Sequence, residues 1–257
     1  LAHSTGAYTL RENASVNAPM LTTMTDVAMD MSTGSTFSAP LLTEFSGSEV
    51  SLRSDRSFDT GALTDIDNSR FGAEGGVEWG AGLGDLLATS YSSTGLWSRT
   101  SRTDQNNATY NWYLFDASGT GTVLDLSSLQ SIDAGFDDND RDRNYQWIRA
   151  LDNAVVDLSS VESIEGPGGY GSEGEDRLRI VMSGGGLVNL SGLKRIEDGG
   201  GGYTQFEIDR ANYQLNMLER ANRALFYLSA GTELEARAVE EVFSTTFDLD
   251  DGAIVHL

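Results

Sequence analysis

One sequence element recurs at a fixed spacing in this chain of 257 residues, and it constrains the fold more than any other feature. Asp125–Ile132 reads DLSSLQSI, Asp157–Ile164 reads DLSSVESI and Asn189–Ile196 reads NLSGLKRI, so the element returns every 32 residues. Apolar residues occupy the same places in each copy, with small polar residues between them. A fixed period of this length predicts a solenoid, in which one repeat buries its apolar side chains only by stacking on its neighbours.

Weaker copies of this element lie on both sides of the three clear ones, at about 21 residues apart. They keep apolar or small residues three positions apart. The copies are Ala18/Leu21/Met24, Ala39/Leu42/Phe45, Thr60/Leu63/Ile66 and Ala236/Val239/Val242.

A polar residue between two inward apolar ones begins or precedes most copies, and this alternation with period 2 is typical of a β-strand. We expect these polar residues to form one outward column. The column reads Asn17, Ser38, Asp59, Glu78, Asp125, Asp157, Asn189, Asn216, Glu235 and His256.

Four residues before most members of that column stands a residue that accepts a left-handed backbone, which predicts a turn in each coil. These residues are Asn13, Gly34, Asp55, Gly121, Asn153, Gly185, Asn212, Gly231 and Gly252, and only the coil at 74–76 is out of step. A second alternating strand precedes the turn, as in Leu178–Val181. Each coil is therefore predicted to contain a strand, a turn, a second strand and a short third side.

The predicted fold is an all-β, single-stranded parallel β-helix (β-solenoid) of about ten coils that forms one domain over residues 1–257. A leucine-rich repeat is the main alternative, but it needs one strand and a helix or loop in each repeat. The segments 214–224 and 233–243 have a composition that suits a helix. Because both fall in register with the coils, we interpret them as strand and edge.

The chain resembles the repetitive β-helical regions of large secreted and cell-surface (adhesin-like) bacterial proteins. The resemblance is carried by the three serine-leucine copies, by Leu63–Ile66 (LTDI) and by Gly185–Leu190 (GGLVNL), and it extends over nearly the whole chain. It implies an extracellular or cell-surface, structural or adhesive role. It supplies no catalytic residues.

Composition excludes several classes of function. The chain has no cysteine, which excludes a disulfide framework, a thiolate metal site and a cysteine nucleophile. A formal net charge of -22 argues against nucleic acid and against anionic membrane surfaces as partners. Membrane insertion is not expected either, because no apolar run approaches the ~18 residues needed to span a bilayer.

Longer loops are predicted at one corner of the solenoid, where insertions in repeat proteins usually gather on the binding face. They span residues 92–111, 133–144, 165–177 and 197–203. We expect a ridge of aromatic side chains there that stacks on sugar rings or packs against a partner protein, or else covers the solenoid edge. The candidate binding residues are Trp97, Tyr110, Phe136, Tyr145, Tyr170 and Tyr203.

The second of these loops carries a cluster of aspartates that could wrap a calcium ion, since calcium prefers oxygen ligands. Its members are Asp133, Asp137, Asp138, Asp140 and Asp142. The loop is not an EF-hand, and Arg141 and Arg143 compete for the carboxylates, so a solvated acidic loop is the alternative. No other cofactor is expected.

A polysaccharide-cleaving β-helix enzyme remains an alternative function. Asp125 and Asp157 lie one coil apart in the outward column, at the ~5 Å spacing of stacked strands, which would suit a pair of catalytic carboxylates. An Asp/Asn column is also what hydrogen bonding between coils would select. His3 and His256 lie at the two ends of the chain, and we expect neither to take part in a catalytic or metal site.

The function expected from the sequence is a non-enzymatic scaffold or adhesive segment that binds a polysaccharide or a surface protein. A self-assembling filament subunit is the alternative, because Ala253–Leu257 repeats the start of a coil and then stops. An open coil offers unpaired strand edges to a second copy, so self-association through the solenoid ends is a predicted contact.

Overall fold

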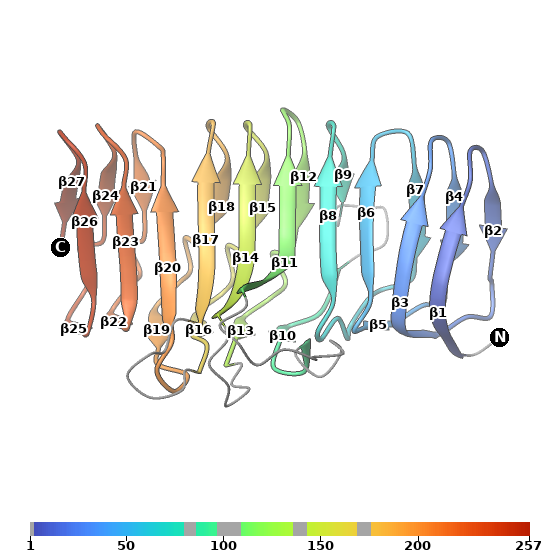
Figure 1. The fold of residues 1–257 in the computed structure, drawn as a ribbon, viewed down its shortest axis with the longest axis horizontal. Coiled ribbons are helices and arrows are strands. Elements are labelled where there is room, and N and C mark those ends of the chain that lie inside the picture. Colours follow the sequence, from blue (N-terminus) through green and yellow to red (C-terminus); the bar gives the residue numbers. More distant parts are fainter. Residues whose placement is uncertain (1–2, 80–85, 97–108, 136–142, 169–175) are drawn as a thin grey trace.

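A computed structural model describes residues 3–79, 86–96, 109–135, 143–168 and 176–257, and assigns 27 β-strands within them. This described part of the chain contains no α-helix. The strands pair in parallel with strands of neighbouring coils, and Figure 1 shows the coils stacked along the longest axis of the molecule. The predicted parallel β-solenoid is confirmed. Among these residues no helix is found that could cross a membrane.

The main sheet receives one long strand from each successive coil and forms the front of the molecule in Figure 1. A short strand, β5 (Glu44–Ser46), pairs with β3 beside this path. In order, the main-sheet strands are β1 (His3–Leu10), β3 (Thr23–Met31), β6 (Glu49–Arg53), β8 (Arg70–Glu74), β11 (Thr109–Ser118), β14 (Arg143–Leu151), β17 (Arg177–Ser183), β20 (Tyr203–Ile208), β23 (Ala224–Leu228) and β26 (Thr246–Leu249).

The strand after each turn lies on the second side of the solenoid, in three separate sheets. These are β2 (Ser15–Asn17), β4 (Thr36–Ala39) and β7 (Ser57–Thr60); β9 (Glu78–Trp79), β12 (Val123–Asp125), β15 (Val155–Asp157) and β18 (Leu187–Asn189); and β21 (Tyr213–Gln214), β24 (Glu233–Glu235) and β27 (Ile254–His256).

The third side is a sheet of six short strands that ends at the loop corner. They are β10 (Ser90–Ser92), β13 (Ser131–Asp133), β16 (Ser163–Glu165), β19 (Arg195–Glu197), β22 (Arg220–Asn222) and β25 (Glu241–Phe243).

The core lies between the three sides and is built from columns of equivalent apolar residues. Strand β17 alternates half-buried and buried residues along its length, as a strand with one face in a core must. The 32-residue copies stack in exact register, with Leu124 beside Val156 and Ile132 beside Ile164. The sequence period therefore records the stacking of side chains in the core.

Aromatic rings also stack inside the solenoid. Phe206 and Phe226 lie 4.8 Å apart between ring centroids with an interplanar angle of 15°, and Phe226 and Phe247 lie 5.0 Å apart at 9°. Near the other end, Phe37 stacks on Phe58 at 5.3 Å. Parallel strands in register place identical rings one above another, which explains these stacks.

The predicted turn column is confirmed at most of its positions. The backbone is left-handed at Asn13, Gly34, Gly121, Asn153, Gly185, Gly231 and Gly252, but not at Asp55 or Asn212. At Gly185 a Cβ atom would lie 2.4 Å from Oδ1 of Asn153 in the coil before it. Glycine takes this left-handed backbone, at φ 82°, without strain, whereas an added Cβ atom would require the Asn153 side chain to move.

Two members of the predicted outward column are wrong. Glu78 pairs with Val123, two positions before the column residue Asp125, and Gln214 rather than Asn216 pairs with Glu235. In the first case, at Glu78, the left-handed residues Gly75 and Gly76 change the path of the turn that precedes the strand.

In the second case Tyr213 is the buried residue that aligns with Leu234, whereas Met217 is 47% exposed. The apolar flanks of Asn216 in the sequence therefore gave the wrong register. The segments 214–224 and 233–243 form strands β21, β22, β24 and β25, as interpreted, and a leucine-rich repeat is excluded by the strands on all three sides.

Candidate functional site

The predicted aromatic ridge is only partly within the described residues. Trp97, Phe136 and Tyr170 lie outside them. Tyr110, Tyr145 and Tyr203 lie at or near the first residues of β11, β14 and β20, so they belong to the main sheet rather than to free loops. Whether they bind a ligand stays a prediction.

The outer face of the main sheet carries a second set of aromatic residues, which the sequence analysis did not single out as a site. Tyr113 on β11 stacks on Trp147 on β14, with ring centroids 5.8 Å apart and an interplanar angle of 28°. The guanidinium of Arg179 on β17 covers the Trp147 ring at 4.0 Å, and that of Arg149 covers Tyr113 at 4.1 Å. We call Tyr113, Trp147 and Arg179 the outer ladder.

Polar contacts hold the outer ladder in place. Arg149 donates two hydrogen bonds to Asp116, from Nε to Oδ1 at 3.0 Å and from Nη2 to Oδ2 at 2.6 Å. Arg179 donates from Nε to Oε1 of Glu207 at 2.7 Å. Trp147 donates from Nε1 to Oδ1 of Asn111 at 2.9 Å. Since cations and neighbouring rings cover faces of Tyr113 and Trp147, these faces are not free to stack on a sugar.

Beside the outer ladder, the same face of the sheet is hollowed. Ser51 and Gly72 pair across β6 and β8 and have little or no side chain, which leaves a depression of about 300 Å³. An adjoining depression of about 550 Å³ lies toward the loop corner and shares Glu49 and Arg70 with the first. We call the two together the outer groove. Its polar and aromatic lining includes Asp26, Asp30, Glu49, Ser51, Arg70, Trp112, Tyr113 and Asp116.

Some charged residues of the outer groove have a partner of opposite charge and others do not. Arg70 forms an ion pair with Glu49, and its guanidinium lies 5.6 Å from the centroid of Trp112. Asp116 is bound by Arg149. The carboxylate of Asp30 is exposed and has no hydrogen bond or ion pair with any described residue. The groove therefore presents an excess of negative charge, which disfavours an anionic ligand.

The predicted calcium loop lies mostly outside the described residues, which include Asp133 but not Asp137, Asp138, Asp140 or Asp142. Asp133 accepts a hydrogen bond from the amide of Gly135 at 2.8 Å. Its neighbours along the third side are Glu165 and Glu197. Partial burial raises the pKa of Glu165 above its ordinary value, and the charges of Asp133 and Glu197 add to the rise.

A second carboxyl on this side is also perturbed. Burial raises the pKa of Asp67, and the nearby charges of Asp65 and Asp133 add to the rise. A hydrogen bond from the amide of Ser92 to Asp67 Oδ1, at 2.8 Å, acts in the opposite direction. These acids lie together without forming a complete ligand set among the described residues, so calcium stays a prediction.

The carboxylates considered for catalysis, Asp125 and Asp157, do pair in register. Each accepts a hydrogen bond from a backbone amide two residues later, of Ser127 at 2.9 Å and of Ser159 at 3.0 Å. Asp157 also accepts one from Nδ2 of Asn189 at 3.1 Å. The column thus stabilises the corner after each strand and joins coils.

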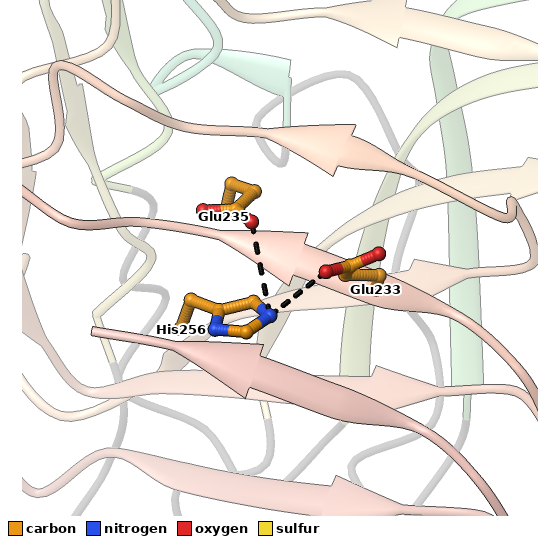
Figure 2. Close-up of side chains that lie close together, drawn as sticks. All are labelled: Glu233, Glu235 and His256. Atoms are coloured by element: carbon orange, nitrogen blue, oxygen red, sulfur yellow. Dashed lines mark hydrogen bonds and ion pairs between the residues drawn. The ribbon is translucent and has the colours of Figure 1, made fainter.

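The two last strands of the second side bring a histidine beside two carboxylates, which the sequence analysis did not expect. Figure 2 shows His256 of β27 facing Glu233 and Glu235 of β24. The Nε2 atom of His256 lies 2.8 Å from Oε1 of Glu233 and 3.7 Å from Oε1 of Glu235. The sequence did contain one indication of this cluster, because Glu235 and His256 are successive members of the outward column.

Comparisons with protein-family models, with curated proteins and with solved structures give no match for this chain. Its function must therefore be argued from its own side chains, and two places qualify. One is the outer groove, and the other is the cluster of Glu233, Glu235 and His256.

Proposed function

We propose that this chain is a non-enzymatic, adhesive segment of a secreted or cell-surface protein, and that it binds a neutral or cationic glycan chain along the outer groove. The observation that carries the proposal is the groove itself, two adjoining hollows with a mixed polar and apolar lining on the outer face of the main sheet. A solenoid presents extended surfaces of this kind to extended ligands.

The chemistry of the groove suits sugar hydroxyls. Carboxylates such as Asp30 and Glu49 accept hydrogen bonds, Ser51 both donates and accepts, and Arg70 donates. Tyr113 is 38% exposed at one side and adds a half-apolar surface. Binding sites for small ligands combine apolar surface with a few placed polar groups in this way.

The charge of the groove selects among glycans. Asp116 pairs with Gly72 and Asp30 lines the same hollow, and the chain as a whole has a net charge of -22. A polyuronate would meet repulsion, whereas a neutral glucan or a chain of amino sugars would not. We therefore expect binding to neutral or amino-sugar polymers.

A non-enzymatic role is supported by the state of the groove carboxylates. Glu49 forms an ion pair with Arg70 and Asp116 forms one with Arg149, so neither carboxylate stands free to act on a bound polymer. An enzyme remains the alternative, and release of new reducing ends from a bound polymer would establish it. End-to-end assembly into filaments also stays a prediction.

The experiment is affinity electrophoresis of the full chain through gels that contain a neutral glucan, glycol chitosan or polygalacturonate. We expect retardation by the first or second polymer and none by the third. Tyr113→Ala removes one wall of the groove, where the exposed part of the side chain rather than a free ring face would contact the glycan, and is expected to weaken retardation by about tenfold. Tyr227→Ala is the matched control, because Tyr227 is a tyrosine on the same sheet face, 36% exposed, outside the groove.

Equal weakening by both tyrosine variants would move the site away from the outer groove. Retardation by polygalacturonate alone would contradict the charge argument. Absence of retardation in all three gels, together with capture of a surface protein by the same face, would replace the glycan with a protein partner.

A further inference from the structure

Glu233, Glu235 and His256 form a cluster of three metal-ligating side chains away from the outer groove, on the second side of the solenoid. Two of them come from one strand. Glu233 and Glu235 are two residues apart on β24, so the alternation of the strand points both to the same face. His256 lies on β27, directly opposite Glu235 in the parallel pair.

The donor atoms already have nearly the separations that a small metal ion requires. One atom from each side chain lies within 4.8 Å of the other two. Ligands at 2.0–2.1 Å in a tetrahedron around zinc would be about 3.3 Å apart. The two measured separations from His256 Nε2, 2.8 Å to Glu233 and 3.7 Å to Glu235, fall on either side of that value.

The backbone holds these positions. Glu233 and Glu235 pair with Ile254 and His256 in an unbroken register, so the three Cα atoms are fixed by the ladder of the sheet. Glu235 is the least exposed of the three side chains, at 18%. Figure 2 shows the three side chains close together on β24 and β27, with Nε2 of His256 facing both glutamates.

A fourth side chain, Arg237, contacts both carboxylate oxygens of Glu235, and its contact with Oε1 has to give way when that oxygen binds an ion. Arg237 lies 2.7 Å from Oε2 of Glu235 through its Nε atom, which leaves Oε1 as the oxygen nearer His256. Its second contact, from Nη2 to Oε1, is longer at 3.2 Å. Arg237 is mostly exposed and can turn toward solvent. Partners of this kind commonly orient ligating carboxylates.

The donor set identifies the class of ion. An imidazole nitrogen with two carboxylates suits zinc and other divalent transition metals, whereas calcium and magnesium favour oxygen ligands alone. We propose that Glu233, Glu235 and His256 bind a divalent transition-metal ion, with zinc as the best fit, and that the ion links strand β24 to strand β27. This site is independent of the proposed glycan groove.

The test is isothermal titration of the full, metal-free chain with zinc chloride and, separately, calcium chloride. We expect one zinc per chain bound more tightly than any calcium. Zinc is also expected to raise Tm, because an ion that binds only the folded state stabilises it. A cobalt derivative should show the visible absorption bands of a four-coordinate ion with a nitrogen ligand.

Three variants locate the ion. Glu233→Gln and His256→Ala are each expected to weaken zinc binding by more than about tenfold, since even loss of an outer-shell partner has an effect of that size. His3→Ala is the matched control, because His3 and His256 are the two histidines of the chain. Circular dichroism of each variant without metal confirms that it is folded.

Wild-type affinity for zinc in folded His256→Ala would overturn the proposal. So would equal binding of calcium and zinc, because that result would describe a general effect of the acidic surface. If zinc binds neither the wild type nor the variants, the proposal is wrong and the cluster is only a group of side chains in polar contact, His256 with the two glutamates.

Discussion

Two ladders of stacked side chains run along opposite faces of the main sheet, and different forces stabilise them. The inner ladder is Phe206, Phe226 and Phe247, of which the first two are fully buried in the core. The outer ladder is Tyr113, Trp147 and Arg179, half-exposed and joined to carboxylates. The same in-register stacking therefore serves hydrophobic burial inside and cation–π and ionic contacts outside.

The comparison shows that parallel strands in register stack side chains of any chemical kind, because equivalent positions of successive coils lie directly beside one another. On the inner face the side chains are buried and therefore apolar, so the alternation of apolar residues along each strand is clear in the sequence. Outside, aromatic, cationic and acidic residues alternate, and their partners come from coils about 30 residues away in the sequence. Three substitutions test this contrast, and a fourth tests the charge of Asp67 on the third side.

The largest effect is expected from breaking the inner ladder. Phe226→Ala removes a buried ring and leaves a cavity, so the free energy of unfolding should fall by about 3–5 kcal/mol. Urea denaturation followed by circular dichroism measures it. Tyr227→Ala, one residue away but facing solvent, should lose less than about 1 kcal/mol. Equal losses would mean that the inner stack adds nothing particular to stability.

Breaking the outer ladder should have a smaller effect. Trp147→Ala removes the ring between Tyr113 and Arg179 and its hydrogen bond to Asn111, and we expect a loss of about 1–2 kcal/mol. The same denaturation experiment applies. A loss as large as that of Phe226→Ala would show that half-exposed stacking is equivalent to burial in this fold.

A conservative change sharpens the contrast further. Arg179→Lys keeps the charge near Glu207 but removes the planar group over Trp147, with an expected loss of about 0.5–1 kcal/mol. Arg53→Lys is the matched control, because Arg53 pairs with Glu74 on the same sheet. Its expected effect is close to zero, since exposed ion pairs contribute little. If the two variants lose equal stability, the ring contact is not what stabilises the outer ladder.

The smallest effect concerns Asp67, a carboxyl of the third side that lies near the charges of Asp65 and Asp133. A carboxyl whose pKa is raised on folding binds more protons in the native state, so stability falls as pH rises through the raised pKa. Asp67→Asn keeps an oxygen for the amide of Ser92 and removes the charge. At neutral pH we expect Tm to rise by about 1 °C, a modest gain because solvent screens part of the interaction.

Calorimetry at several pH values measures this gain. Below the ordinary aspartate pKa of 3.8 both states are protonated and the difference should vanish. A gain independent of pH would assign the effect of Asp67→Asn to something other than charge.

The parts of the fold that repeat could be predicted from the sequence. The copies at Asp125, Asp157 and Asn189 set the coil, and left-handed residues such as Asn153 and Gly185 mark its corner. The errors came where the repeat is irregular. Glu78 follows a double-glycine turn, and the apolar neighbours of Asn216 suggest an inward position that Tyr213 actually takes.

The candidate sites were harder to predict, because each depends on neighbours from other coils. The outer groove exists since Gly72 and Ser51 lie side by side, which becomes apparent only when β6 and β8 are placed in register. The contact of His256 with Glu233 is diagonal across two strands. An alignment of the repeats shows which residues lie directly beside one another on neighbouring strands, but it does not show diagonal contacts such as this one.

Each strand bonds only to strands of adjacent coils, and this has a mechanical consequence. Under tension applied at its two ends, such a molecule should yield coil by coil, because removing one coil leaves the contacts of the rest intact. A coil of 21 residues would release about 70 Å of chain and one of 32 residues about 110 Å. The molecule would then act as an extensible tether. Its longest coils lie in the middle of the chain, so the largest increases in length would come from there.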